Sequence, residues 1–434
     1  MRRSTAATLL LILVSLFPAA FAVLIQPPPL TSAGAALGAA GRITGIAALA
    51  CLLVSAAVSA RLPGFDRGFG GLTRLWRRHH YLGATAFLLA MAHPLLLAWS
   101  GLSVSTGAAV GFLFPAPEHI WIWAGWAALL CMMVFLAPSF GFFGPPHYQR
   151  WKGLHLLSGA AVALALVHAV PLSRALPPAW AWPIWTLFGA AAVAAFAYRV
   201  VLSRRLARHR HRVTGITPLS HDVVEITLRP EGRRLAYRAG QFVYLAHLDR
   251  NLDAGYNEEH PYTLSSAPQD EELRIGVKAL GDQSRALQRI TPGAIVTVEG
   301  PYGDLFPEAL DDRPQLWLAG GIGITPFVAR ARALAHAGGP AAPVTLVYCA
   351  KNMERAYYLD ELRSISSRLP GFTVEAHLFE REGPLTAAYL DRACPGWRER
   401  EVFHCGPPGM YDHCRALMRA NGVRHMQTEE FDLL

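Results

Sequence analysis

The sequence has 434 residues, of which 52% are hydrophobic and 16% are charged. This composition argues against a wholly soluble protein and suits a protein of which about half lies in a membrane. The net charge of +9 divides unevenly, because there are 17 Lys and Arg against two Asp and Glu up to Arg212, and 23 against 29 after it. The basic excess therefore reflects membrane topology and excludes nucleic-acid binding.

Six apolar segments of membrane-spanning length occupy the first 202 residues. The first, 1–25, is either a signal peptide or a retained span, and we favour the span. The others are 35–60, 81–100, 120–138, 153–172 and 183–202. Fifteen basic residues lie on the side of the N-terminus, and Arg42 and Arg174 lie on the other side. The positive-inside rule thus predicts a multi-pass protein of the cytoplasmic membrane with its C-terminal half in the cytoplasm.

Two of these spans carry two histidines each, His79 and His93 in one, His155 and His168 in the other. The steps of 14 and 13 residues correspond to ~21 and ~20 Å along a helix, which puts one histidine of each span near each membrane face. Neutral imidazole is an axial ligand of haem, so the pattern predicts two bis-imidazole haem sites. Thirteen residues do not return to the same helix face, so the second span needs tilt, a bulge or different rotamers, and His80 competes with His79. The alternative is that these histidines are interhelical hydrogen-bond donors and acceptors.

The sequence changes character after the last span. The basic run 202–212 is predicted to extend the helix against anionic headgroups. Short β-rich runs at 223–228, 242–248, 273–280 and 294–300 predict a small antiparallel barrel. From Pro314 a strand–glycine turn–helix alternation predicts a doubly wound α/β nucleotide-binding domain. We therefore expect an all-α membrane bundle at 1–204, a barrel at 205–308 and an α/β domain at 309–434.

The predicted barrel contains two motifs suited to a nucleotide with a flat ring. HPYTLSSA at 260–267 offers Tyr262, Thr263 and either Ser265 or Ser266, an aromatic face with hydroxyls. LRIGVKALGDQS at 273–284 then offers Lys278, followed by Gly281 and Ser284 at a helix start suited to a pyrophosphate.

The predicted α/β domain has two glycine motifs in the order expected of a dinucleotide site. AGGIGITPF at 319–327 follows a buried strand, and its glycines let backbone amides reach a phosphate. CGPPGM at 405–410 follows a later strand. Lys351 and Arg355 either pair with a 2′-phosphate or form a solvated helix start, so the choice between NADH and NADPH stays open.

With these motifs in place, residues 218–434 resemble the ferredoxin–NADP reductase superfamily. Nearly the whole chain resembles the NADPH oxidase and transmembrane ferric reductase superfamily. The resemblance implies two haem b groups, an inner one held by His79 with His155 and an outer one held by His93 with His168, and it places Arg42 beside the outer haem. It implies FAD contacts from His260, Pro261, Tyr262, Thr263, Ser265, Lys278, Gly281, Asp282, Ser284 and Phe431. It implies NAD(P)H contacts from Gly320, Gly321, Gly323, Thr325, Lys351, Arg355, Cys405, Gly406 and Pro407.

The implied activity is electron transfer from NAD(P)H through FAD and two haems to an external acceptor. The acceptor is a ferric chelate or dioxygen. Animal oxidases carry an additional histidine where this chain has Leu97, which favours the ferric chelate. From the residues alone, Cys405 is equally a buried small residue, and Arg42 is equally a side chain that extends to the interface. A different class of function is a histidine-based metal or proton transporter with a regulatory reductase-like domain.

Overall fold

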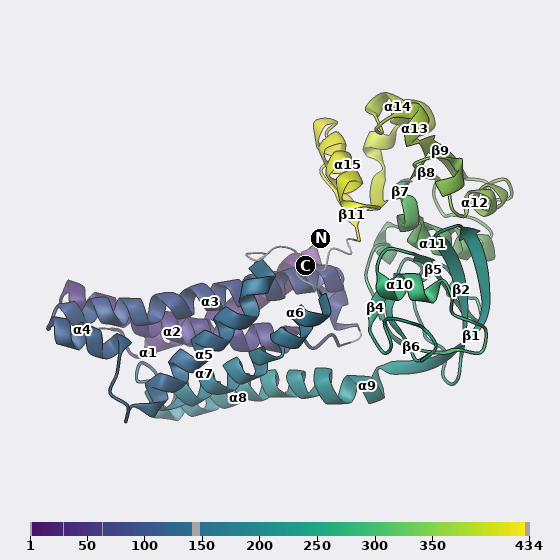
Figure 1. Ribbon diagram of the computed structural model, residues 1–434. Helices are drawn as coiled ribbons and strands as arrows, with labels where there is room; N and C mark the ends of the chain where they lie inside the picture. Colours follow the sequence, from purple (N-terminus) through teal and green to yellow (C-terminus); the bar gives the residue numbers. More distant parts are fainter. Residues whose placement is uncertain (1, 29, 63, 141–147, 430–434) are drawn as a thin grey trace. The chain divides into compact units, whose positions relative to one another are not determined.

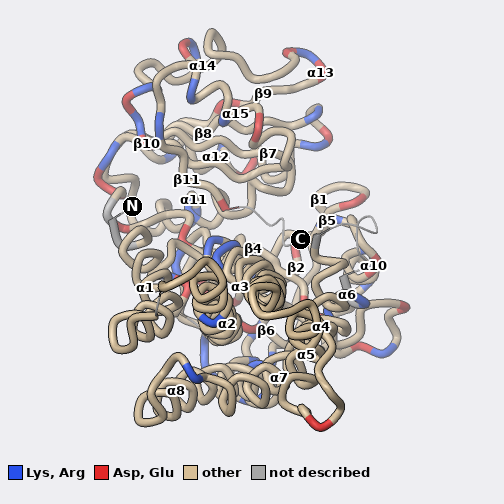
Figure 2. Tube along the Cα trace, turned by 90° about the vertical axis from the view of Figure 1, so that its left-hand side faces the viewer, with Lys and Arg blue, Asp and Glu red and all other residues tan. Residues whose placement is uncertain are grey.

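The protein is described from a computed structural model, which covers residues 2–28, 30–62, 64–140 and 148–429. It forms two compact units (Figure 1). The first consists of Met1–Leu62 and Arg74–Arg204, and the second of Pro63–Thr73 and Arg205–Leu433. Lys, Arg, Asp and Glu are sparse along the helices of the first unit and frequent on the second (Figure 2).

In the described part of the chain, six helical segments are long and apolar enough to cross a membrane, which confirms the predicted spans. They are α1 (Arg2–Ile25), α2 (Ala33–Val58), α3 (Leu72–Leu102), α5 (Ile120–Leu136), α6 (Tyr148–His155) followed by α7 (Leu157–Leu172), and α8 (Pro178–Ala197). A short helix, α4 (Thr106–Leu113), connects α3 to α5. The N-terminal helix is held in the bundle, because Ser15 and Ala22 are buried and Arg78 of α3 donates hydrogen bonds to Thr8 and Ser4.

A stripe of four glycines brings α2 close to α3. A Cβ atom added to each would lie less than 3.0 Å from a side chain of α3 or of Ser103, which follows it, in the pairs Gly34 with Ser103, Gly38 with Ser100, Gly41 with Leu97, and Gly45 with His93. Small residues at this spacing are a usual means of close helix packing in membranes. Because no side chain intervenes, backbone groups of α2 come within hydrogen-bonding distance of α3.

The fifth span is interrupted at Leu156, between its two histidines. The amide of Leu156 bonds to the carbonyl of Gly153, and the amide of Gly159 to that of Leu156, so this turn is wound with i to i−3 bonds. Tighter winding rotates the two halves of the span relative to each other. The interruption therefore supplies the local irregularity that the 13-residue step requires.

The second unit begins with a curled antiparallel sheet in the order β4-β3-β6-β1-β2-β5. Its strands are β1 (Arg208–Ser220), β2 (Val223–Pro230), β3 (Phe242–His247), β4 (His260–Thr263), β5 (Leu273–Lys278) and β6 (Ile295–Tyr302). A bridge between Leu264 and Ile275 joins the two edges, so the predicted barrel is confirmed. Helix α10 (Asp282–Leu287) follows β5.

The prediction that the basic run 202–212 extends the last helix is confirmed for its first residues, which form α9 (Ser203–Leu206), and was wrong from Arg208 onward. Helix α9 ends at Leu206, and β1 starts at Arg208 and pairs with β6 from Glu299 to Ile295. The run RHRHRV alternates, with His211 and Val213 buried and Arg210 and Arg212 exposed. That two-residue period suits a half-buried strand, and pairing with β6 outweighs the attraction of arginines to headgroups.

The predicted α/β domain is confirmed as a parallel sheet in the order β11-β10-β7-β8-β9. Its strands are β7 (Gln315–Gly320), β8 (Val344–Ala350), β9 (Phe372–Leu378), β10 (Glu401–Cys405) and β11 (Met426–Thr428). Helices α11 (Thr325–Ala337), α12 (Leu359–Ser366), α14 (Ala387–Ala393) and α15 (Pro408–Ala420) connect them. Trp317 packs in one core with α11 and α12, and its neighbours Leu316 and Leu318 pack in another with α14 and α15, so both faces are covered.

Candidate functional site

The two histidine pairs predicted from the sequence face each other within the helical unit. The ring centres of His93 and His168 are 6.1 Å apart, and those of His79 and His155 are also 6.1 Å apart. Two metal–nitrogen bonds of about 2.1 Å, plus the distance of about 1.1 Å from the bonded nitrogen to the centre of each ring, add up to about 6.4 Å between ring centres. Both pairs therefore have the separation that one metal ion between two imidazoles requires.

Three of the four rings are oriented through Nδ1 by backbone carbonyls. His93 Nδ1 lies 2.6 Å from the carbonyl oxygen of Gly41, His168 Nδ1 lies 2.9 Å from that of Trp121, and His79 Nδ1 lies 2.9 Å from that of Ser55. A carbonyl accepts a hydrogen bond from Nδ1–H, which keeps the proton on Nδ1 and leaves the lone pair on Nε2 for a metal. His155 is held by aromatic rings, Trp151 at 5.1 Å and Phe135 at 5.2 Å.

Two glycines make room for the rings of His93 and His168. A Cβ on Gly45 would lie 2.7 Å from His93 Nδ1, and one on Gly125 would lie 2.6 Å from His168 Nδ1. The sequence analysis missed both residues, as well as the three carbonyl oxygens, of Ser55, Gly41 and Trp121, that accept the hydrogen bonds from Nδ1. The glycine stripe of α2 was a visible signal for Gly45, whereas a backbone carbonyl carries no residue-type signal.

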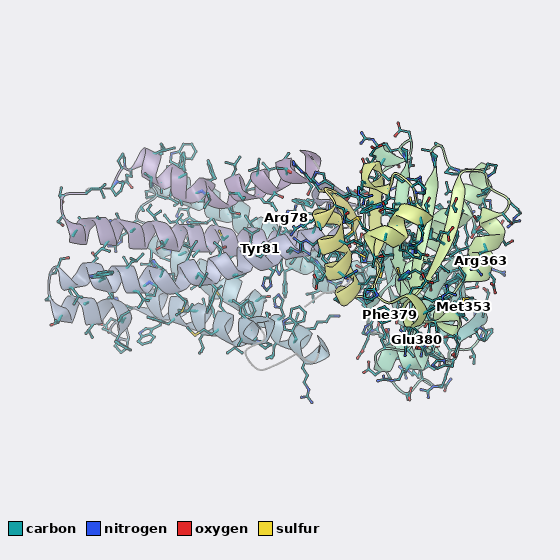
Figure 3. The ribbon with its side chains drawn as sticks, turned by 90° about the horizontal axis from the view of Figure 1, so that it is seen from above. Arg78, Tyr81, Met353, Arg363, Phe379 and Glu380 are labelled. Atoms are coloured by element: carbon teal, nitrogen blue, oxygen red, sulfur yellow. The ribbon has the colours of Figure 1, made fainter. Side chains whose placement is uncertain are left out.

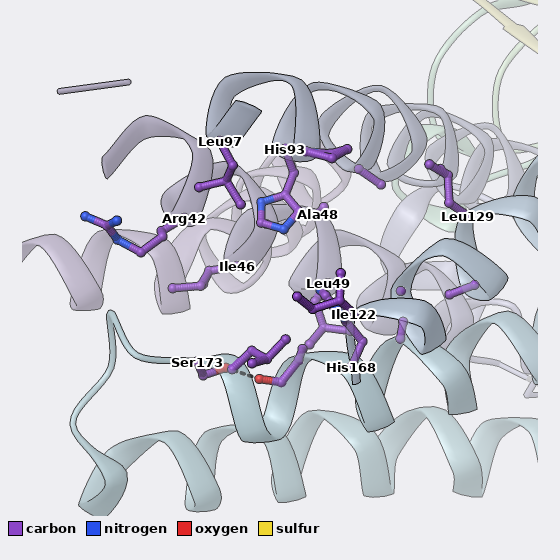
Figure 4. Close-up of a pocket in the computed structure, with 18 of the residues that line it drawn as sticks. Arg42, Ile46, Ala48, Leu49, His93, Leu97, Ile122, Leu129, His168 and Ser173 are labelled. Carbon is purple, nitrogen blue, oxygen red and sulfur yellow. Dashed lines mark hydrogen bonds between the residues drawn. The ribbon is translucent and has the colours of Figure 1, made fainter. Parts of the chain in front are cut away.

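A cavity of about 570 Å³ opens beside His93 and His168. His93, His168, Arg42 and Leu97 line it, together with Arg174 (Figure 4). Within the part of the chain that the structure describes, no group of three or more His, Cys, Asp or Glu could hold a bare metal ion. Two imidazoles per site suit a metal that brings its own equatorial ligands, and the cavity provides space for a flat macrocycle. These residues fit a haem.

The predicted flavin motifs meet on one edge of the barrel. Tyr262 of β4 donates a hydrogen bond to Gln283 Oε1 at 3.1 Å, which ties the HPYT strand to the start of α10. Ser284 caps α10 by accepting bonds from the amides of Leu280 and Gly281. His260, Pro261 and Lys278 are half-buried here, Gly281 and Asp282 are exposed, and Thr263 is buried at the end of β4. The edge thus offers an aromatic face beside a helix start.

Ser265 lies two residues beyond the end of β4. It is fully buried and donates to Glu225 Oε1 at 2.6 Å, while its carbonyl accepts from Arg332 at 3.0 Å. Arg332, on α11, also bonds to both oxygens of Glu225 and of Glu361. This cluster, which we call the Arg332 cluster, joins the flavin strand to the helix of the GGIGITP motif.

The two glycine motifs of the α/β domain pack directly on each other. A Cβ on Gly323 would lie 2.5 Å from the carbonyl oxygen of Cys405, and one on Gly320 would collide with Met410. Gly321 has a φ of +54°, a conformation that favours glycine, and a Cβ added there would meet no atom within 4 Å. Thr325 begins α11, whose N-terminus suits a dinucleotide phosphate.

Of the remaining predicted contacts, some lie beside the glycine motifs and others are held in ion pairs. Gly406 and Pro407 lie between β10 and α15 beside Gly320. Arg355 is engaged by Asp222 at 2.5 Å and by His221, and Lys351 pairs with Glu380 at 3.5 Å. Phe431 lies outside the described residues.

Three family models match successive parts of the chain. They are the ferric reductase like transmembrane component at residues 44–167, an FAD-binding domain at 209–305 and the oxidoreductase NAD-binding domain at 317–416. Dual oxidase 1 of Caenorhabditis elegans is 23% identical over 58% of this chain and 17% of its own length, and NADPH oxidase 1 of Mus musculus is 25% identical over 35% and 24%. Ferredoxin–NADP reductase B of Sorangium cellulosum is 30% identical over 51% of this chain and 96% of its own length.

The chain belongs to the NADPH oxidase and ferric reductase superfamily. It is a transmembrane oxidoreductase with an FAD-binding and an NAD-binding module. The alignments cover less than a quarter of either oxidase, so their activities are not transferred to it as they stand.

In this superfamily member, Gly323→Ala is expected to cut NAD(P)H-driven flavin reduction at least about tenfold and to destabilise the domain by about 1–3 kcal/mol. The added methyl would displace the backbone at Cys405, which cannot yield as a flexible side chain does. Stopped-flow flavin reduction and thermal unfolding would measure the two effects. Gly232→Ala, where a Cβ meets open space, is the control. Native kinetics in Gly323→Ala would contradict the packing argument.

Cys405 is expected to resist alkylation in the native protein. The thiol is 3% exposed, and burial raises its pKa to about 12, so its thiolate fraction at pH 8 is on the order of 1 in 10,000. Differential iodoacetamide labelling read by mass spectrometry should show modification of Cys405 only after unfolding. Rapid labelling of the folded protein at pH 8 would indicate an accessible, activated thiol instead.

Proposed function

We propose that this protein uses cytoplasmic NAD(P)H to reduce an acceptor on the opposite side of the cytoplasmic membrane, and that this acceptor is a ferric chelate. The bound groups would supply the redox chemistry, with FAD accepting hydride from the nicotinamide and two b-type haems conducting single electrons across the membrane. The observation that carries the proposal is the arrangement of the four histidines. His79 faces His155 and His93 faces His168, each with 6.1 Å between ring centres, from the third and fifth membrane spans.

The residues of this chain would bind and orient these groups. His79 with His155, and His93 with His168, would hold the two irons, and the carbonyls of Ser55, Gly41 and Trp121 would fix the ring orientations. The edge formed by His260–Thr263, Lys278 and Gly281–Ser284 would hold FAD. The glycines of the two α/β motifs would bring backbone amides to the dinucleotide phosphates.

The choice of side rests on charge. Fifteen basic residues would lie on the cytoplasmic side and two, Arg42 and Arg174, on the other. Both of these line the outer cavity, where their positive charge would attract a carboxylate chelate of ferric iron. Leu97 lines the same cavity with an apolar side chain, which offers no hydrogen bond to bound dioxygen.

The test is anaerobic reduction of the purified full chain by NADH and by NADPH, followed by absorption spectroscopy. We expect flavin bleaching, then reduced b-type haem bands, and reoxidation when ferric citrate is added. Reoxidation by air alone, with reporter reduction sensitive to superoxide dismutase, would favour an oxidase. A dithionite-reduced spectrum without haem bands would refute electron transfer and favour a metal or proton transporter.

A further inference from the structure

A carboxylate is fixed at the edge of the parallel sheet where the loops after β8 and β9 meet. Glu380 lies on α13 (Phe379–Glu382), and its amide donates to the carbonyl of Lys351 at 3.0 Å. Its side chain accepts a hydrogen bond from Asn352 Nδ2 at 3.1 Å and pairs with Lys351 Nζ at 3.5 Å. Both the backbone and the side chain of Glu380 are therefore held in place beside Lys351.

The cations of these two loops are all paired with carboxylates. Lys351 contacts Glu380, Arg355 contacts Asp222 at 2.5 Å, and Arg381 contacts Glu382 at 2.5 Å. The side chain of Asp222 is 19% exposed, and that of Arg355 is 29% exposed. Ion pairing with Arg355 and a bond from Ser220 hold the pKa of the Asp222 carboxyl below its ordinary value, although burial opposes this, so the carboxylate stays charged at neutral pH.

This distribution of charge bears on the adenosine end of the coenzyme. The 2′-phosphate of NADPH carries nearly two negative charges at neutral pH and needs unpaired Arg or Lys donors. In dinucleotide-binding sheets of the doubly wound type, an acidic side chain about 20 residues after the glycine turn hydrogen-bonds the ribose 2′-hydroxyl of NAD. Here the carboxylate at this edge is Glu380, which comes from the loop after β9 and is bonded to Lys351 and Asn352, the residues that follow β8. The glycine turn here follows β7, and β8 is the neighbouring strand.

Two exposed apolar side chains flank the carboxylate. Met353 is 52% exposed and Phe379 is 56% exposed, and both are labelled with Glu380 in Figure 3. Met353 follows Asn352 in one loop, and Phe379 precedes Glu380 in the other, so the hydrogen bond between Asn352 and Glu380 keeps the two near each other. Apolar surface next to a few fixed polar groups is typical of a site for a purine base.

We infer that the protein selects NADH over NADPH, with Glu380 as the residue that accepts the ribose 2′-hydroxyl and repels a 2′-phosphate. This rests on the proposed function, since it concerns the electron donor of that same reaction. In this assignment Lys351 stays paired with Glu380 and Arg355 stays paired with Asp222, and neither cation binds a 2′-phosphate.

The test is stopped-flow flavin reduction of the full chain under anaerobic conditions, with NADH and NADPH titrated separately. The ratio of kcat/KM for NADH to that for NADPH is expected to exceed about 10 in the native protein. Glu380→Gln is expected to narrow the ratio at least about fivefold through a lower KM for NADPH, and Glu380→Lys to reverse the preference. Glu399→Gln, an exposed carboxylate elsewhere on this domain, is the control and should leave the ratio unchanged.

Equal or better use of NADPH by the native protein would overturn the inference, and so would a ratio that Glu380→Gln does not move. Either result would leave the proposed function standing, because both coenzymes would still reduce the flavin. If neither coenzyme reduced the flavin, the proposed function itself would fail.

Discussion

Replacing His79 with alanine is expected to lower NAD(P)H-driven reduction of an external acceptor at least about 100-fold and to remove about half of the bound haem. His79 faces His155 and receives fixed orientation from Ser55, so alanine leaves the inner pair with one ligand. Flavin reduction by NAD(P)H should remain at the native rate, because the FAD-binding barrel belongs to the other unit. Haem-to-flavin ratio, flavin bleaching and acceptor reduction are the three measurements.

The chain provides a matched control one residue away. His80 is exposed, and its ring packs edge-on against Tyr81 with 6.4 Å between ring centres. His80→Ala should retain both haems and the native rate. If His80→Ala lost a haem while His79→Ala kept both, the assignment of the inner ligand would be wrong.

Arg332→Met is expected to lower the free energy of unfolding of the second unit by about 3–5 kcal/mol. Arg332 is 8% exposed, and although burial lowers its pKa, Glu361 and Glu225 raise it above its ordinary value, so it is charged throughout the working range. Removing it leaves the buried carboxylate of Glu225 without its cation. We expect the temperature at which FAD fluorescence is released on heating the full chain to fall by about 10 °C.

Two further variants separate this effect from general disruption. Arg313→Met breaks an exposed pair with Glu401 and should cost less than about 1 kcal/mol. Glu225→Gln combined with Arg332→Met should recover at least about 1 kcal/mol, because the uncompensated charge is gone. Strict additivity of the two losses would show that Arg332 acts independently of Glu225.

The histidine pairs were predictable because an ionisable residue in a membrane span is rare enough to be informative by itself. His79, not its competitor His80, is the residue whose ring faces His155, and its assignment as a ligand stays a prediction. The break at Leu156 was not predictable in position, because no Pro stands there and the flanking Gly153 and Gly159 do not by themselves fix where a helix is interrupted. Helix spacing could show only that some irregularity was needed.

Other parts of the site depend on tertiary contacts that residue types do not reveal. Ser265 belongs to a flavin motif in the sequence, yet the proximity of Arg332, 67 residues later, turns it into an interior partner of Glu225. Arg355 was a candidate partner of a 2′-phosphate, but its guanidinium donates a hydrogen bond to Asp222, which lies 133 residues earlier in the sequence. Residues 208–212 of the basic run were likewise expected to be helical, and their strand conformation depends on pairing with β6, which is distant in the sequence. The two domain boundaries, after residues 204 and 308, stay predictions.

The contact between Gly41 and His93 has a consequence for how this protein tolerates mutation. The acceptor is a main-chain oxygen, which every amino acid possesses, so no substitution can delete it by changing polarity. What substitution can do is add bulk, since the glycines at 34, 38, 41 and 45 face α3 with no spare room. Saturation libraries over α2 should therefore rank variants at these four positions by side-chain volume, with serine and alanine harmed least and the hydrogen-bonding capacity of the new residue nearly irrelevant.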